Sequence, residues 1–155
     1  MSEAVQENTQ ATFNLEKIYV KDVSLEIPHA PQIFLERDPP QIDVQLHTRA
    51  DSFETGLFEV VVTATVTART GEKVMFLIEV KQAGVFRINN VPSKELEQIM
   101  GVMCPNILFP YLREVVSDVS VRAGFASVLL NPINFEALYQ QQKLQAQGTV
   151  TETTH

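Results

Sequence analysis

Residues 57–80 read LFEVVVTATVTARTGEKVMFLIEV, and this stretch decides the fold. Apolar side chains occupy the even positions on both sides of a short polar link that contains Gly71. Because successive side chains of a β-strand point to opposite faces, the alternation predicts two strands that each bury one face. A glycine in a short link between two such runs is typical of a β-hairpin.

Two further strands are expected before this hairpin. Residues 41–48 alternate in the same way, with an apolar face made of Ile42, Val44 and Leu46. Residues 13–27 alternate too, but their apolar positions change phase twice: Phe13 and Leu15, then Ile18 and Val20, then Val23, Leu25 and Ile27. Side-chain direction cannot change phase in a regular strand, so a bulge or bend is predicted near residues 16–22.

The segment between these two strands is rich in proline, with Pro28, Pro31, Pro39 and Pro40. Proline cannot donate a backbone hydrogen bond, and regular strand pairing is therefore excluded here. A long crossover loop is expected instead, and it carries the apolar residues Ile33, Phe34 and Leu35. Long ordered loops in compact domains are often functional.

Helical periodicity follows the hairpin. Apolar residues recur at i, i+3, i+4 and i+7 from Leu96, with Ser93 as the expected N-cap. Residues 104–106 read Cys-Pro-Asn and should break or kink this helix, after which the apolar pattern continues to Val119. A second helix is expected from Asn134, a residue suited to capping, and its glutamine-rich continuation has few side chains to bury.

Strands first and helices after predict an α+β fold. The expected architecture is a four-stranded antiparallel sheet with a long crossover loop after the first strand, a long kinked helix and a second, C-terminal helix. One domain is expected over residues 13–144. The polar segments on either side, an acidic N-terminal tail at 1–12 and a C-terminal tail at 145–155, are expected to be disordered.

Composition and motifs argue against several classes of function. The net charge of −7 disfavours nucleic-acid binding, which relies on clustered Lys and Arg. The three histidines lack a second ligand at metal spacing, the single cysteine Cys104 is expected in the core, and no cofactor motif is present. Without a secretory signal or an apolar run near the ~18 residues of a membrane span, the cytoplasm is expected and membrane insertion is not.

Apolar residues exceed what one sheet and one helix can cover. The surplus predicts an oligomer interface, a groove for apolar ligands, or both. Candidate groove residues come from the crossover loop and both helical regions: Phe34, Phe109, Phe125, Leu129, Leu130 and Leu138. Candidate interface residues lie on the long helix: Leu108, Leu112, Val115 and Val116.

Four separated motifs, in matching order, carry a resemblance to a known family. They are Lys21–Glu26 with Pro28–Pro31, Phe76–Val80 with Gln82, Gly84 and Phe86, Cys104–Tyr111 with Arg113 and Glu114, and Asn131–Phe135. In these motifs the chain resembles SecB protein-export chaperones from about residue 13 to 140. The resemblance implies a non-enzymatic cytoplasmic homotetramer, a dimer of dimers, that binds unfolded preproteins without ATP.

The resemblance also implies a partner, the SecA translocation ATPase. Its C-terminal zinc-binding segment is expected to dock on the acidic face of the sheet at Asp22, Glu26, Leu77 and Glu79. Two alternatives stay open. The residues alone also fit an α+β domain that binds a small hydrophobic ligand on a half-open sheet. Within the family, a chaperone dedicated to one client, such as an antitoxin, is the other.

Overall fold

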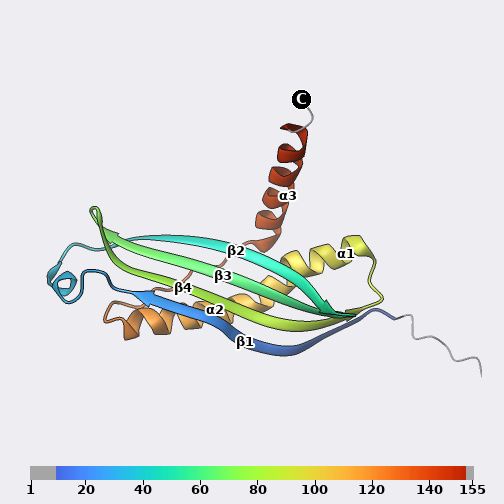
Figure 1. Ribbon diagram of the computed structural model, residues 1–155, viewed down its shortest axis with the longest axis horizontal. Helices are drawn as coiled ribbons and strands as arrows, with labels where there is room; N and C mark the ends of the chain where they lie inside the picture. Colours follow the sequence, from blue (N-terminus) through green and yellow to red (C-terminus); the bar gives the residue numbers. More distant parts are fainter. Residues whose placement is uncertain (1–9, 153–155) are drawn as a thin grey trace, which may run out of the picture.

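The computed structural model describes residues 10–152, with side chains to residue 146. Four strands form one antiparallel sheet in the order β1-β4-β3-β2. Their bounds are β1 Thr12–Glu26, β2 Gln41–Glu54, β3 Leu57–Thr70 and β4 Lys73–Asn89. The predicted α+β architecture is confirmed: the strands come first, and a long helical segment then runs along one face of the sheet (Figure 1).

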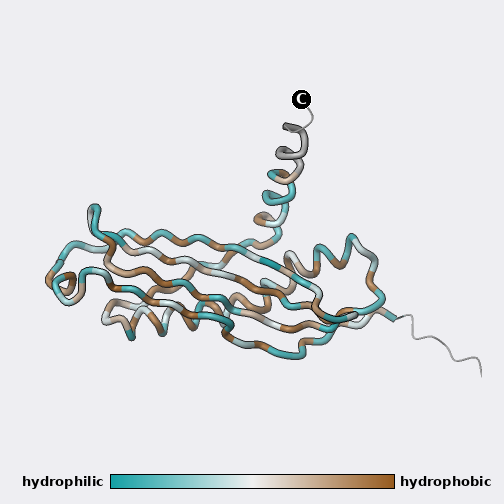
Figure 2. Tube along the Cα trace, viewed as in Figure 1, coloured by the Kyte–Doolittle hydropathy of each residue, from teal (hydrophilic) through white to brown (hydrophobic). Residues whose placement is uncertain are grey.

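The core forms where the predicted alternation is cleanest, on the two central strands. In β3 the even positions from Val60 to Ala68 are fully buried, and in β4 Phe76, Ile78 and Val80 face the same side. Figure 2 shows the alternation of apolar and polar residues along these strands. We call the side that carries these residues the inner face, because helix α2 (Cys104–Arg122) packs there, and the opposite side the outer face.

Two bulges interrupt β1, as its phase changes predicted. The pairing with β4 shifts between Leu15 and Lys17 and again between Val20 and Asp22, so Glu16 and Lys21 are the extra residues. After each bulge the alternation is shifted by one residue, so side chains that would have faced inward face outward. As a result, Lys17 and Tyr19 lie on the outer face although Leu15 lies on the inner one.

A buried glutamine holds the bulged part of β1 to β4. Gln82 is 2% exposed, and its Nε2 donates a hydrogen bond of 3.1 Å to the carbonyl oxygen of Tyr19. Its Oε1 is buried with no partner among the described residues. Two positions further along, Gly84 leaves room for α2, since a Cβ there would lie 2.9 Å from Cδ2 of Leu108.

The crossover loop contains one short helical turn, η1, at Gln32–Leu35. Ile33 anchors this turn in the core at 2% exposure, while Phe34 is half exposed and Leu35 is 80% exposed. Ile33 therefore anchors the loop in the core, and Leu35 faces the surface.

The long helix is made of three consecutive parts: α1 at Ser93–Gln98, a π-helical segment η2 at Ile99–Met103, and α2 at Cys104–Arg122. The predicted irregularity thus lies directly before Pro105, which has no N–H for the carbonyl four residues earlier. The expected N-cap is wrong by one residue, because Ser93 is already helical and Pro92 precedes it without a side-chain cap.

Three of the four expected interface residues belong to the core of this single chain. Leu108, Leu112 and Val116 are 0% exposed, because the face of α2 that they form packs on β3 and β4. The expectation that they meet another subunit is therefore wrong. Val115 is half buried, and the exposed apolar residues of this helix are Met103, Tyr111 and Val121.

The long helix is apolar over much of its length. By length and composition alone, the helical segment Ser93–Arg122 could cross a membrane, with a mean hydropathy of 1.2 over its most apolar window. The core helix of a folded domain meets the same criterion of length and composition. Here α2, the last part of this segment, packs one face on the sheet.

The C-terminal helix α3 spans Phe135–Glu152 and projects away from the sheet (Figure 1). Asn134 caps it as predicted, since its Oδ1 accepts a 3.0 Å hydrogen bond from the backbone N–H of Ala137. Residues 145–152, expected in a disordered tail, are helical. Residue 12, assigned to the other tail, opens β1, and residues 1–9 and 153–155 lie outside the described part of the chain.

Candidate functional site

The four residues expected at the acidic docking site lie together on the outer face. In the β1–β4 pairing Glu26 is opposite Leu77, and Glu79 is opposite Ser24, two positions from Asp22. The bulge at Lys21 produces this arrangement, because it turns Asp22 and Glu26 outward while Val23 and Leu25 stay on the inner side. We call these four residues the acidic patch.

The acidic patch is open to a partner. Asp22 and Glu26 are exposed, and Leu77 and Glu79 are half buried. The register adds Asp43 on β2, which sequence reasoning missed: it pairs with Thr67, and Thr67 pairs with Leu77. Strand order and register were needed to find it, because nothing local distinguishes Asp43 from other polar strand residues.

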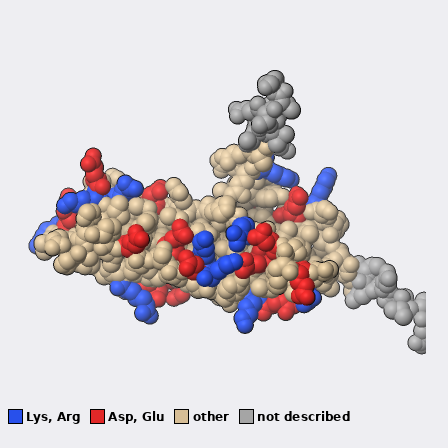
Figure 3. All heavy atoms as spheres, in the orientation of Figure 1, with Lys and Arg blue, Asp and Glu red and all other residues tan. Residues whose placement is uncertain are grey.

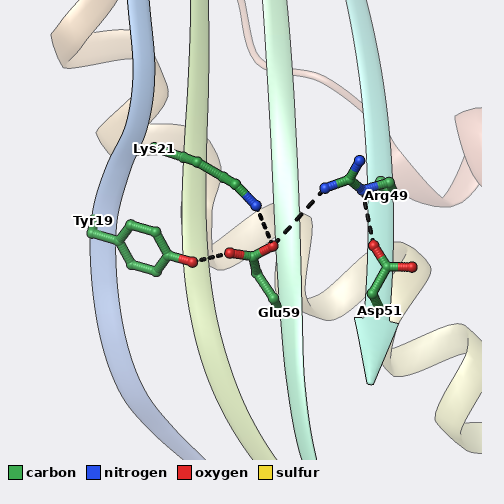
Figure 4. Close-up of polar contacts among 5 residues, drawn as sticks. All are labelled: Tyr19, Lys21, Arg49, Asp51 and Glu59. Atoms are coloured by element: carbon green, nitrogen blue, oxygen red, sulfur yellow. Dashed lines mark hydrogen bonds and ion pairs between the residues drawn. The ribbon is translucent and has the colours of Figure 1, made fainter. Parts of the chain in front are cut away.

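The middle of the outer face carries a network of charges on three strands. Glu59 of β3 accepts hydrogen bonds from Tyr19 and Lys21 of β1, the latter at 2.6 Å, and Arg49 of β2 lies 4.0 Å away (Figure 4). Arg49 also pairs with Asp51 at 2.9 Å. Figure 3 shows acidic and basic side chains side by side over the middle of the sheet.

This network is a structural arrangement with little capacity for proton transfer. The hydrogen bond from Lys21, followed by that from Tyr19, lowers the pKa of Glu59 below its ordinary value, so the carboxylate stays ionised. Burial, and then the hydrogen bond to Glu59, raises the pKa of Tyr19 to about 12. A carboxylate locked as acceptor and a phenol locked as donor do not exchange protons near neutral pH.

The described residues contain no candidate metal site and no activated nucleophile. No group of three or more His, Cys, Asp or Glu side chains within them could hold a metal ion. Cys104 is fully buried, and this burial raises the pKa of its thiol to about 12. A thiol in that state is a small apolar core residue.

On the inner face, an apolar cavity opens beside edge strand β2. Its volume is about 390 Å³. Three of the expected groove residues, Phe109, Leu129 and Leu130, line it. The remaining walls come from the inner side of β2 and from the segment after the long helix: Ile42, Val44 and Leu46, and Ser127, Val128, Asn131 and Ile133.

Sequence reasoning identified the alternation of β2 but did not connect it with this cavity. The long helix packs on the two central strands, and Ile42 and Val44 of the edge strand therefore stay 45% and 39% exposed. Knowing that β2 is an edge strand would have been enough to predict this.

The other three expected groove residues lie elsewhere. Phe34 and Phe125 form an aromatic cluster with Phe76. The ring centroid of Phe125 lies 5.2 Å from that of Phe34 and 4.8 Å from that of Phe76. Leu138, on α3, packs against the core. Phe109 is 5% exposed, with the guanidinium of Arg113 4.9 Å from its ring centroid. The six residues thus form a cavity, an aromatic cluster and one separate contact.

The inner side of the other edge strand is uncovered as well. On β1 the inward-facing Leu15, Val20, Val23 and Leu25 are between 37% and 45% exposed. Exposed apolar strips of this kind mark surfaces that another molecule covers. The sheet therefore has an apolar strip along each edge and charged groups across its outer face.

Known proteins are similar in sequence to this chain over most of its length. Residues 6–146 match the family described as preprotein translocase subunit SecB. A protein-export protein SecB of Methylobacillus flagellatus is 54% identical over 99% of this chain and 98% of its own length. That of Nitrosomonas eutropha is 62% identical over 88% of this chain and 87% of its own length.

A solved structure shares the fold. It is a SecB-like chaperone of Mycobacterium tuberculosis in complex with a peptide from an antitoxin, with a TM-score of 0.65, 16% identity, and coverage of 78% of this chain and 90% of that one. The sequence relatives carry more weight, because they combine high identity with nearly complete coverage. On these grounds the chain belongs to the SecB family.

Proposed function

We propose that this protein is a chaperone of protein export that holds non-native precursors without ATP and passes them to the SecA translocation ATPase in the cytoplasm. The observation that carries the proposal is the apolar inner side of the two edge strands, found in a chain of the SecB family. Proteins named protein-export protein SecB match it over most of their length. No step of this activity makes or breaks a covalent bond, so the protein is not an enzyme.

The cavity beside β2 is the proposed client-binding site. An extended client segment can place apolar side chains against Ile42, Val44 and Leu129, with roughly 25 cal/mol of stabilisation per Å² of apolar surface removed from water. Its backbone can pair with the free edge of β2. Because buried area does not depend on residue order, low sequence selectivity follows.

A photo-crosslinking experiment tests this site. Leu129 and Ile42 are exposed and line the cavity, whereas Thr65 lies on the outer face. Photoreactive side chains at the first two positions should capture an unfolded precursor, and the same group at Thr65 should capture much less. Equal labelling at all three positions would show diffuse binding without a cavity.

We propose the acidic patch as the docking site for the C-terminal zinc-binding segment of SecA. Three carboxylates around one half-buried leucine, Leu77, offer a cationic segment both charge and an apolar contact. The patch lies on the outer face, opposite the proposed client site, so a bound client leaves it free.

Reversing one charge of the patch should weaken this docking. Glu79→Lys places a cation beside Lys81, two positions along the same strand, and should cost about 1–3 kcal/mol of binding free energy. Titration calorimetry with the isolated zinc-binding segment measures the change. The matched control is Glu72→Lys, the same charge reversal at an exposed turn position away from the patch. Unchanged affinity for Glu79→Lys would show that the segment docks elsewhere.

We propose a homotetramer built as a dimer of dimers. The apolar strip on β1 and the exposed Met103, Tyr111 and Val121 of the long helix need cover, and closed symmetric packing supplies it. Light scattering on the wild type and on Glu79→Lys should give the same mass, about four times 17.4 kDa. A monomeric wild type would contradict the assembly.

A further inference from the structure

The outer face has a hollow at Val85 of β4, six residues along that strand from Glu79 of the acidic patch and different from the patch in character. Its volume is about 480 Å³. It is lined by Lys17, Tyr19, Asp51, Phe53, Glu59 and Val85, which come from all four strands. None of these residues belongs to the acidic patch or to the proposed client cavity.

Bulges at both edges of the sheet shape this hollow. In β1 the bulge at Glu16 turns Lys17 and Tyr19 onto the outer face. In β2 the register shifts between Ser52 and Glu54, so Phe53 is the extra residue there. Phe53 is 59% exposed, an unusual position for a phenylalanine on the solvent side of a sheet.

The base of the hollow is apolar although it lies on the solvent side of the sheet. Val85 pairs with Lys17 on one side and with Glu59 on the other. Two residues along the strands from Glu59 and Val85, the next pair on this face, Val61 and Ala83, is buried. The side chains of Tyr19 and Lys21 extend from β1 across β4 towards Glu59 (Figure 4), and the hollow begins beside this network.

Only one charge on its walls is available to a ligand. Asp51 pairs with Arg49 at 2.9 Å, and Glu59 is held by Lys21 and Tyr19. Lys17 is exposed and forms no ion pair with the described residues. The hollow therefore presents an apolar surface and one free ammonium group, a charge preference opposite to that of the acidic patch.

We propose that this hollow is a docking site for an extended peptide segment of a protein partner, which places an apolar side chain against Phe53, Tyr19 and Val85 and a neighbouring carboxylate at Lys17. Charge complementarity supports an acidic segment, because the only unpaired charge is positive. The shape supports a peptide: the hollow is open, and a small molecule is normally enclosed over most of its surface. A peptide needs no such enclosure, because only one of its side chains enters the hollow. The residues on either side of it can contact the sheet along the strands.

Fluorescence anisotropy with the full chain and a labelled peptide tests the proposal. The probe is Gly-Ser-Phe-Asp-Ser-Gly, and its two controls replace Asp by Lys or Phe by Ser. The first peptide should bind, and both controls should bind less tightly. Phe53→Ser should weaken binding of the probe about tenfold through lost apolar contact. Lys17→Ser should weaken it about three- to fivefold, as one exposed charge contact does.

Matched variants separate this site from the client cavity. Lys73→Ser removes an exposed lysine at the far end of β4 and should leave binding unchanged. Phe53→Tyr keeps the ring and should restore affinity. Since Lys17 and Phe53 are both exposed, these variants should keep the circular dichroism and Tm of the wild type. The proposal is overturned if the lysine-containing peptide binds as tightly as the probe, or if Leu129→Ser rather than Phe53→Ser abolishes binding.

Discussion

Leu112→Glu is expected to abolish folding of the subunit itself. Leu112 is 0% exposed in the core between α2 and the sheet. The substitution removes an apolar side chain, worth about 2–5 kcal/mol, and adds the cost of burying a carboxylate. The sum is comparable with the whole free energy of unfolding of a small domain, about 5–15 kcal/mol. Circular dichroism and solubility after expression should show an unfolded or aggregated chain.

Val121→Glu is the matched control, on the same helix but 54% exposed. It should keep the circular dichroism of the wild type, because its side chain is exposed on the folded subunit and the core does not depend on it. The pair separates a core role from an interface role. If Leu112→Glu instead yielded folded dimers, the burial of this residue within one subunit would be contradicted, and its assignment to an interface would be restored.

Gly84→Val should lower the free energy of unfolding by about 3 kcal/mol, the upper range for overpacking a core. A Cβ at this position would lie 2.9 Å from Cδ2 of Leu108 and 3.2 Å from the carbonyl oxygen of Lys17. The leucine can move, but the carbonyl belongs to the neighbouring strand β1. The two γ-methyl groups of valine would also force α2 away from the sheet. Urea denaturation of the purified variant measures the loss.

Gly71→Asn is the control, at the hairpin turn between β3 and β4. Its φ is +60°, which asparagine tolerates better than most residues, and no atom lies within 4 Å of a Cβ built there. Its unfolding midpoint should stay near that of the wild type. Similar midpoints for Gly84→Val and wild type would mean that α2 does not depend on this close approach.

The sheet could be predicted because its signal is local. Alternation over 57–80 defines the central hairpin, and the phase changes in 13–27 place both bulges of β1. The later part of β4 was harder to predict. Gln82, Ala83 and Gly84 hide the apolar pattern there, although the strand continues to Asn89 with Phe86 and Ile88 on the inner face.

Helical periodicity alone could not assign the faces of the long helix. Leu108, Leu112 and Val116 were expected at a subunit interface, and they are the residues that pack on the sheet of the same chain. Periodicity shows that a helix has an apolar stripe, but not which surface covers it. The close approach of Leu108 to Gly84 of β4 shows that this stripe faces the sheet, and only the tertiary structure reveals that contact.

Of the two candidate sites, one could be predicted from local sequence patterns and the other could not be predicted completely. The acidic patch could be predicted, because alternation places Asp22 and Glu26 on one face of β1, and Leu77 and Glu79 on one face of β4. The client cavity could be predicted only in part. Phe109, Leu129 and Leu130 are close in sequence, but the β2 residues opposite them depend on strand order, which no local pattern contains.

The bulges also make the two edges of the sheet unequal templates for strand addition. On β1 the regular stretches are short, at 12–15, 17–20 and 22–26, whereas β2 is regular from 41 to 52. An interrupted edge resists pairing with stray chains, because its free N–H and C=O groups lose their even spacing. An unfolded chain should therefore add to the sheet on one side only. Amyloid-like growth from both edges is disfavoured in a molecule whose work is to hold aggregation-prone chains.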